Sequence, residues 1–236
     1  MILLTGGSGL LGQELQKHIE CYAPSHDEFN ILNHPELPNN IHMIVHCAAY
    51  TDVVKAEEER DLCYSTNVAG TKKVAALGVP IVYISTEYVF EGGTGNYSEM
   101  STPYPQNFYA LTKLNGEGMC MRAPASLIIR CLFKPRPFEH EHACTDQWTS
   151  GDYVDVMAPL IAKAILLYEK DVIRHSFRCV ADLGHDIVHV GTGRKSTFDL
   201  AKQSNPNVKP CLRSDIKSVK LPMDTSLDTT QWETKW

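Results

Sequence analysis

Residues 5–12 read Thr-Gly-Gly-Ser-Gly-Leu-Leu-Gly, directly after a short apolar run and directly before a helical pattern. In that context the spaced glycines have separate tasks. Gly6 permits a tight turn, Gly9 lets a pyrophosphate approach the backbone, and Gly12 lets the helix pack closely on the strand. The start of the helix offers unpaired N–H groups to the phosphates. The stretch therefore predicts a dinucleotide-binding turn, with glycines of an ordinary turn as the alternative.

Apolar runs alternate with helical patterns through the first 130 residues, which favours βαβ units and a buried parallel sheet. We expect an α/β fold: a doubly wound sheet over 1–132 and a smaller lobe over 133–236, with a ligand cleft between them. A strand at 187–191 can return from the lobe to the main domain. The expected strands are 2–5, 43–49, 80–85, 126–132 and 187–190, and the expected helices are 10–20, 55–62, 67–77, 108–121, 153–169 (bent at Pro159) and 196–204.

Composition limits the class of protein. The chain has 236 residues, of which 43% are hydrophobic and 21% charged, so it can build a core. Lys and Arg number 22 against 28 Asp and Glu, a net charge of −6, which argues against a nucleic-acid partner. The N-terminus lacks the basic region of a signal peptide, and no apolar stretch is long enough for a bilayer. We expect a cytoplasmic protein with no membrane partner.

Cysteine and histidine spacing gives no clear metal or disulfide signal. The eight cysteines include no CxxC pair, so a zinc ribbon is not indicated. Disulfides are one reading of the even count, but reduced, mostly buried thiols in a cytosolic chain are favoured. The run Glu-His-Glu-His at 139–142 can be read as a metal site or as a solvated loop. It has no distant third ligand, and we predict no metal.

A tyrosine and a lysine carry the candidate chemistry. Tyr109 and Lys113 are four residues apart and share one face of a predicted helix. An ammonium beside a phenol lowers the tyrosine pKa from about 10, so Tyr109 can act as a general acid or base. Thr86 follows the strand at 80–85, at the edge of the sheet where ligands bind, and can donate to a substrate carbonyl. A surface tyrosine near a lysine is the alternative for that pair alone.

The residues after the second strand bear on the choice of cofactor. An acidic residue that holds the ribose hydroxyl is expected about 20 residues after the glycine turn. Here Ser25 and His26 would tolerate a 2′-phosphate, whereas Asp27 would repel it if it points inward. We therefore favour NADPH, with NADH left open.

Taken together these motifs resemble the extended short-chain dehydrogenase/reductases, and among them the dTDP-4-dehydrorhamnose reductase group. The resemblance extends over nearly the whole chain and implies a Rossmann-type domain over 1–132 with a small, trimmed substrate-binding lobe over 133–236. It is carried by the glycine turn, Cys47-Ala-Ala-Tyr-Thr-Asp52 with Lys55-Ala56-Glu57, Asn67–Thr71, Ser85-Thr-Glu-Tyr-Val-Phe90, Glu91-Gly92 with Tyr97 and Glu99, Pro103 with Pro105, Tyr109 with Lys113, Asp146-Gln147, Ser214-Asp215, Leu221-Pro222 and Ser226-Leu-Asp228.

The resemblance implies hydride delivery from NADPH to the keto carbon of a nucleotide-activated 4-keto-6-deoxysugar, linked to dTDP or UDP. Tyr109 would supply the proton, Thr86 would polarise the carbonyl, and Lys113 completes the catalytic set. The expected cofactor-binding residues are Gly6, Ser8, Gly9, Leu10, Leu11, Gly12, Ser25, His26, Asn30, Ile31, Cys47, Ala48, Ala49, Tyr50, Asn67, Ser85, Tyr109 and Lys113. The expected substrate-binding residues are Thr86, Glu87, Lys134 and Arg136.

Departures from the group leave alternatives open. Glu87 stands where the group has aspartate, and the segment between Arg130 and Asp146 is short. Lys134 and Arg136 can grip a diphosphate or be solvated loop charges. A 4,6-dehydratase would carry Thr-Asp-Glu, so a reductase is favoured. A nucleotide-sugar epimerase and a non-catalytic NADP-binding regulatory subunit of a partner enzyme remain alternatives, and a homodimer is open.

Overall fold

The short apolar runs form one six-stranded parallel sheet in the computed structural model, which describes residues 1–33, 35–175 and 184–231. Every residue of the four central strands is buried, as expected for a sheet that is covered on both faces. The strands in spatial order are β10 (His185–His189), β5 (Ser126–Cys131), β4 (Ile81–Thr86), β3 (Met43–His46), β1 (Ile2–Thr5) and β2 (Cys21–Tyr22).

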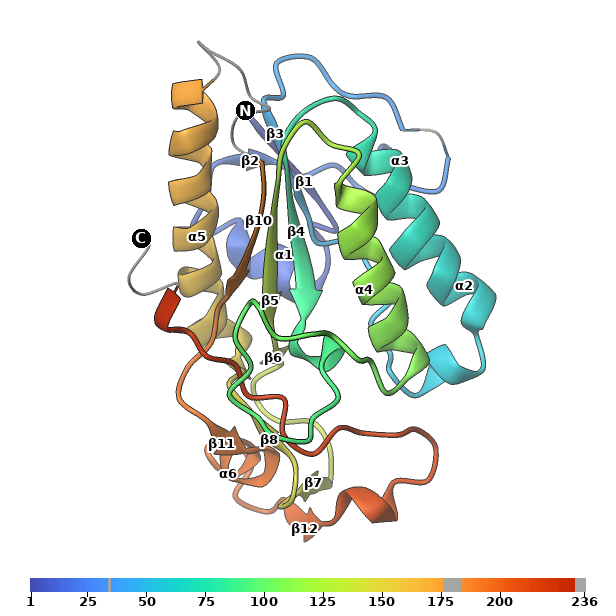
Figure 1. Ribbon diagram of the computed structural model, residues 1–236, viewed down its shortest axis with the longest axis vertical. Coiled ribbons are helices and arrows are strands. Elements are labelled where there is room, and N and C mark those ends of the chain that lie inside the picture. The colour runs from blue at the N-terminus through green and yellow to red at the C-terminus, as the bar shows by residue number, and fades with distance from the viewer. Residues whose placement is uncertain (34, 176–183, 232–236) are drawn as a thin grey trace.

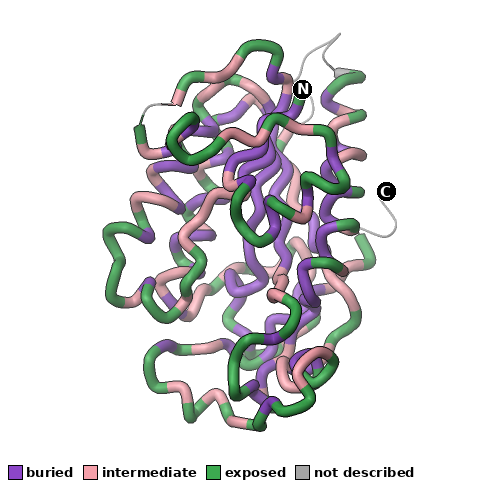
Figure 2. The backbone as a smooth tube through the Cα atoms, turned by 180° about the vertical axis from the view of Figure 1, so that it is seen from behind, coloured by how far each residue is buried: buried purple, intermediate pink, exposed green. Residues whose placement is uncertain are grey.

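Helices cover both faces of this sheet (Figure 1). The helices α1 (Leu10–Leu15) and α5 (Val154–His175) pack together against one face. On the other face lie α2 (Arg60–Tyr64), α3 (Thr71–Ala75) and α4 (Phe108–Cys120). Figure 2 shows the buried backbone concentrated in the strands between these two layers. The expected Rossmann-type doubly wound α/β fold is confirmed.

The strand order places a crevice beside the glycine turn. β1 pairs with β2 on one side and with β3 on the other, all in parallel, so the chain reverses its direction of winding at β1. In doubly wound sheets, ligands bind outside the carboxyl ends of the strands at such a switch point. Here those ends are Thr5 and His46, which are followed by the glycine turn and by Cys47.

The lobe is built from short ladders and one helix. β6 (Phe133–Lys134) pairs with β9 (Asp152–Tyr153), β7 (His142–Cys144) with β12 (Lys209–Cys211), and β8 (Trp148–Thr149) with β11 (Lys195–Ser196). The helix α6 (Thr197–Lys202) starts at Ser196, whose hydroxyl accepts from the Asp199 N–H, as the serine cap predicts.

The sheet domain and the lobe are interleaved in sequence. β10 pairs with β5 in the main sheet, so the strand that was expected to return does so. The preceding helix α5 also packs on the sheet, although its sequence lies inside the expected lobe at 133–236. With α5 and β10 assigned to the sheet domain, the lobe consists of residues 133–153 and 190–231 of the described chain.

Several elements are shorter or more irregular than the sequence pattern suggests. The helix expected at 10–20 ends at Leu15, and the one expected at 55–62 is a 3-10 turn, η1 (Lys55–Glu57), followed by α2. The stretch 67–77 begins within a π-helical turn, η2 (Ser65–Gly70), and continues as α3. Two further 3-10 turns are η3 (Glu87–Val89) and η5 (Arg213–Asp215). α5 runs through Pro159 and on to His175.

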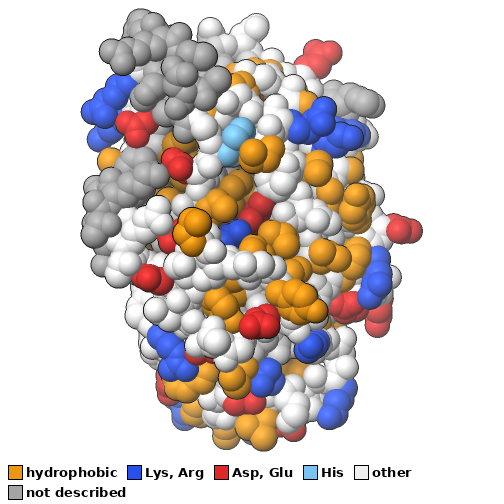
Figure 3. Space-filling model, viewed as in Figure 1, with side chains coloured by type: hydrophobic (Ala, Val, Ile, Leu, Met, Phe, Trp, Pro, Cys, Tyr) orange, Lys and Arg blue, Asp and Glu red, His pale blue; other side chains and the backbone are white. Residues whose placement is uncertain are grey.

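Exposed apolar side chains gather over the α2 and α4 side of the molecule, on the right of Figure 3. Leu62 and Tyr64 of α2 and Leu111 of α4 are exposed. None of the helices in the described part of the chain combines the length and hydropathy that a bilayer span requires.

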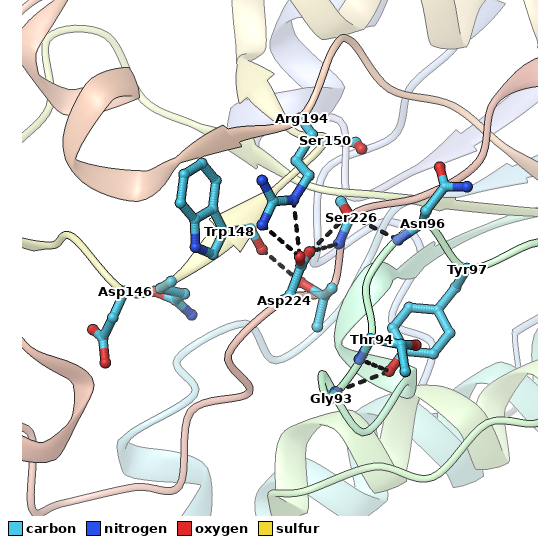
Figure 4. Close-up of polar contacts among 12 residues, drawn as sticks. Gly93, Thr94, Asn96, Tyr97, Asp146, Trp148, Ser150, Arg194, Asp224 and Ser226 are labelled. Atoms are coloured by element: carbon cyan, nitrogen blue, oxygen red, sulfur yellow. Dashed lines mark hydrogen bonds and ion pairs between the residues drawn. The ribbon is translucent and has the colours of Figure 1, made fainter.

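A buried aspartate fastens the C-terminal segment to the lobe and to the loop after β4 (Figure 4). An Asp224 carboxylate oxygen lies 2.8 Å from the Arg194 guanidinium, which stacks on the Trp148 ring at 3.8 Å from its centroid. Ser226 donates to Asp224 at 2.7 Å and accepts from the Asn96 N–H at 2.9 Å. These contacts hold in place the segment that precedes Leu227, which forms a bridge with Tyr97.

Candidate functional site

A cavity of about 1090 Å³ extends from the glycine turn to the lobe. Its volume is at the upper end for small-molecule sites, which usually range from about 300 to 1,000 Å³. Of the residues that the sequence nominated, those that line it are Gly6, Ser8, Gly9, Leu10, Leu11, Gly12, Ser25, His26, Ile31, Cys47, Ala48, Ala49 and Lys134. Those that do not line it are Asn30, Tyr50, Asn67, Ser85, Thr86, Glu87, Tyr109, Lys113 and Arg136.

The glycine turn packs so closely on the protein's own backbone that side chains at Gly6 and Gly12 would clash. Gly6 has φ +72°, and a Cβ added there would lie 2.5 Å from the backbone nitrogen of Ala48. A Cβ added at Gly12 would lie 2.2 Å from the Gly6 carbonyl oxygen. At Gly9 the nearest atom would be that same oxygen, at 3.3 Å. The turn therefore presents bare backbone to the cavity, as close approach of a pyrophosphate requires.

Asn67 acts on the site from behind. Its carboxamide accepts from the Tyr50 N–H at 2.8 Å and donates to the Tyr50 carbonyl at 3.1 Å. It also donates to the Thr112 hydroxyl at 2.9 Å, which ties the loop after β3 to α4. Asn67 and Tyr50 do not line the cavity. They instead hold in position Ala48 and Ala49, which do line it.

Thr86 and Tyr109 meet at the carboxyl end of β4. Their side chains lie near one another, although they come from different elements, and the Thr86 hydroxyl acts to lower the pKa of Tyr109. Thr86 is buried and also accepts from the Tyr88 N–H at 3.2 Å, while Tyr109 is half-buried on α4. Ile84 and Tyr88, which flank Thr86 in sequence, both line the cavity. The pair therefore lies next to the cavity wall.

The expectation that Lys113 lowers the pKa of Tyr109 is wrong for this structure. Lys113 is buried and donates to the Ile84 carbonyl at 2.7 Å, with its ammonium 4.1 Å from the centre of the Tyr83 ring. Burial raises the pKa of Tyr109 above its usual value, and the nearby Thr86 hydroxyl offsets only part of that rise. Burial also lowers the pKa of Lys113 to about 8. The helix brings the two residues to one face, but the lysine is held by the sheet.

Glu87 is not placed to contact a substrate. It is fully buried, accepts from the Thr225 hydroxyl at 2.7 Å and faces the Ser150 N–H at 3.4 Å. Burial raises its pKa to about 7, against the lowering effect of its hydrogen bonds and of Lys134. The sequence placed it next to Thr86, but Glu87 begins the 3-10 turn η3, and its carboxylate lies at the contact between sheet and lobe.

The two basic residues of the lobe have different surroundings. Lys134 lines the cavity, and burial lowers its pKa. Arg136 instead forms an ion pair with Asp155 at 3.0 Å and stacks over the Tyr153 ring, 4.1 Å from its centroid. Only Lys134 is therefore available to a ligand in the cavity, and the expected diphosphate contact by Arg136 is not supported.

The region expected to hold the ribose contains an acid that the sequence reasoning overlooked. Glu28 accepts from both the N–H and the hydroxyl of Ser25, each at 2.8 Å, and these bonds lower its pKa. Asp27 is fully exposed and so does not point inward. His26 lines the cavity beside Ser25.

Part of the cavity wall was missed by the sequence reasoning. The lobe contributes residues 138–144, and Gln147 and Thr197 join them. The run Glu139–His142, read from sequence as a metal site or a solvated loop, thus lies at the cavity. Among the residues that the structure describes, no group of three His, Cys, Asp or Glu is arranged to hold a metal. Periodicity gave no signal for this wall, because its residues belong to loops and a three-residue strand.

A family model described as the RmlD substrate binding domain matches residues 1–133. Methionine adenosyltransferase 2 subunit beta of Rattus norvegicus is 34% identical over 137 residues, which are 49% of this chain and 41% of that protein. The dTDP-4-dehydrorhamnose reductase of Aggregatibacter actinomycetemcomitans is 31% identical over 169 residues, 64% of this chain and 52% of that protein. In these matches the chain spans about half the length of its curated relatives or less.

The similarity to a solved structure covers more of the chain. The dTDP-4-dehydrorhamnose reductase from Bacillus anthracis in complex with NADP superimposes with a TM-score of 0.74 and 26% identity. The match covers 99% of this chain and 92% of that one. The lobe, which lies beyond the region that the family model matches, therefore has a counterpart in that reductase.

Proposed function

The chain belongs to the RmlD substrate binding domain family, and from this premise we propose that it is an NADPH-dependent reductase of a nucleotide-activated 4-keto-6-deoxysugar. The contact between Thr86 and Tyr109, at the carboxyl end of β4 and next to the cavity, carries this proposal. A carbonyl that reaches this pair would meet two hydroxyl groups.

The cofactor site is assigned to the glycine turn and the loop after β3. NADPH supplies a hydride when bound. Gly9 and its neighbours would receive the pyrophosphate on bare backbone, and Ala48 and Ala49 would leave space for the dinucleotide beyond it. The relative that was solved with NADP supports this choice of cofactor. NADH is the alternative, because Glu28 takes up the Ser25 hydroxyl that would otherwise be free for a 2′-phosphate.

Tyr109 would act as the proton donor to the substrate oxygen. Burial raises its pKa, which keeps the phenol protonated at neutral pH. A donor must hold its proton until negative charge develops on the substrate oxygen, and the Thr86 hydroxyl can share that charge by hydrogen bonding. Lys113 contributes a buried positive charge near β4, although it donates to the Ile84 carbonyl.

The reaction can be tested with the purified chain, NADPH and a panel of dTDP- and UDP-4-keto-6-deoxyhexoses. Oxidation of NADPH, followed by absorbance, is the expected result. Tyr109→Phe should lower kcat by about 10²- to 10⁴-fold and leave NADPH binding intact, because only the proton donor is lost. Tyr104→Phe, at an exposed tyrosine, is the matched control. Full activity of Tyr109→Phe would remove Tyr109 from this role.

A second candidate is a subunit of a partner enzyme, which the similarity to methionine adenosyltransferase 2 subunit beta favours. Tyr109 and Lys113 do not line the cavity, which suits a chain that binds a dinucleotide without turnover. Tight NADPH binding with no oxidation across the sugar panel, together with co-purification of a methionine adenosyltransferase, would favour this candidate over the reductase. Light scattering would show whether two copies of the chain join in a homodimer.

A further inference from the structure

Two cysteines face each other across the β7–β12 ladder of the lobe. Cys144 and Cys211 are register partners on these parallel strands, and their Sγ atoms are 3.6 Å apart. Both thiols are free. Adjacent strands lie about 4.8 Å apart, within the range of Cα separations of roughly 4.4–6.8 Å that disulfides span. Side-chain rotation can therefore bring the sulfurs into bonding distance without moving the strands.

Contacts on both sides of the pair hold this register. Before it, the Lys209 N–H donates to the Glu141 carbonyl at 2.8 Å, and the two side chains form an ion pair at 2.6 Å. After it, the Arg213 N–H donates to the Asp146 carboxylate at 2.8 Å. The Arg213 guanidinium also lies 3.4 Å from the Asp146 carboxylate, so the thiols are held face to face by the backbone and by two ion pairs.

We propose that Cys144 and Cys211 form a reversible disulfide, which makes this ladder an oxidation site of the protein. The oxidant is a low-molecular-weight disulfide such as oxidised glutathione. The Cys211 thiolate attacks one sulfur of the oxidant and releases one glutathione thiol. Cys144 then loses its proton and attacks the Cys211 sulfur, and the second glutathione leaves as a thiol. Two protein thiols are oxidised and one glutathione disulfide is reduced.

The order of attack follows from exposure. Cys211 is half-exposed, whereas Cys144 is buried at 3% exposure. Burial and the neighbouring Cys211 raise the pKa of Cys144 to about 12, against the effect of the Arg213 guanidinium. The more accessible thiol therefore meets the oxidant first, and the buried thiol resolves the mixed disulfide.

The bond would act on the cavity. Cys144 lines it, together with the preceding residues of β7 and the loop before them. The segment after β12 contributes Ile216, Val219 and Leu221 to the same cavity. A disulfide would join these two parts of the wall covalently, so oxidation is expected to change the stability of the lobe and the affinity for ligands that fill the cavity.

The experiment uses the full chain equilibrated in glutathione buffers of increasing oxidation, then alkylated and digested without reductant. Mass spectrometry should find a peptide pair joined through Cys144 and Cys211, and the thiol count in denaturant should fall from eight to six. Reductant should restore all eight. The oxidised chain should melt roughly 5–15 °C higher, because the bond closes a long loop.

Cys144→Ser and Cys211→Ser should each abolish the thiol loss and the rise in Tm, and Cys21→Ser, at another half-exposed cysteine, should retain both. The wild-type peptide map stands on its own if a variant does not fold. The proposal is overturned if that map contains no Cys144–Cys211 bond, or if the loss of two thiols persists in Cys211→Ser. Neither result depends on whether the protein reduces a sugar.

Discussion

Replacing Glu87 by glutamine should change how stability depends on pH. Glu87 is fully buried between sheet and lobe, and burial raises its pKa from 4.5 to about 7. Between these two values the folded chain keeps the proton that the unfolded chain has lost. Because the unfolded state then binds fewer protons, the free energy of unfolding falls as pH rises from about 4.5 to about 7, and is level above that.

The size of this effect follows from the pKa difference. Each unit is worth about 1.4 kcal/mol, so a rise of pH from about 5 to about 8 should cost the wild type on the order of 2–3 kcal/mol through Glu87. Glutamine does not titrate, so the variant lacks this loss. The carbonyl oxygen of the glutamine can still accept from the Thr225 hydroxyl, but its NH₂ group would then face the Ser150 N–H. Two donors that face each other lower the stability of the variant by an amount that is the same at every pH.

The assay is urea unfolding of both chains across this pH range, read as the difference in free energy of unfolding. That difference should move in favour of Glu87→Gln by about 2–3 kcal/mol between pH 5 and pH 8. The difference is needed because buried His46 and His189, with pKa values lowered to about 3 and about 4, destabilise the wild type as pH falls below 6.5. Glu91→Gln, at an exposed glutamate, is the control. A difference that stays constant with pH would refute the reasoning.

Four further substitutions test the turn and the core by urea unfolding. Gly12→Ala should lower the free energy of unfolding by about 1–3 kcal/mol and abolish NADPH binding, because its Cβ would lie 2.2 Å from the Gly6 oxygen. Gly118→Ala in α4 is the control, because nothing lies within 4 Å of its new Cβ, and it should raise the free energy of unfolding by about 1 kcal/mol. If both variants lose stability, helix glycines in general are needed and the close contact at Gly12 is not the cause. Arg130→Met tests the core and should lower the free energy of unfolding by about 3–5 kcal/mol. The substitution leaves buried Glu117 without the guanidinium that contacts it at 2.8 and 3.0 Å. Adding Glu117→Gln removes the unpaired charge and should recover part of the lost stability. If the double variant recovers none, the loss comes from packing and not from the buried charge.

The main sheet and the glycine turn were predictable because their signals are local. A buried parallel strand appears as a continuous apolar run, and the turn needs glycine at fixed spacing. The regular helix α4 and the cap at Ser196 were found for the same reason. The irregular turn at Ser65–Gly70 was missed, because its shape depends on Asn67 bonding to Tyr50 and Thr112 from other elements.

The sequence by itself determined the doubly wound sheet, the dinucleotide turn and the identity of the candidate chemical groups. Only the tertiary structure decided what those groups contact. It turned Lys113 toward the Ile84 carbonyl, buried Glu87 against Thr225, and engaged Arg136 with Asp155. Spacing along a chain fixes which face of a strand or helix a side chain occupies, but its partners and its desolvation come from residues far away in sequence. For that reason the pKa values and the cavity wall could be read only from the folded chain.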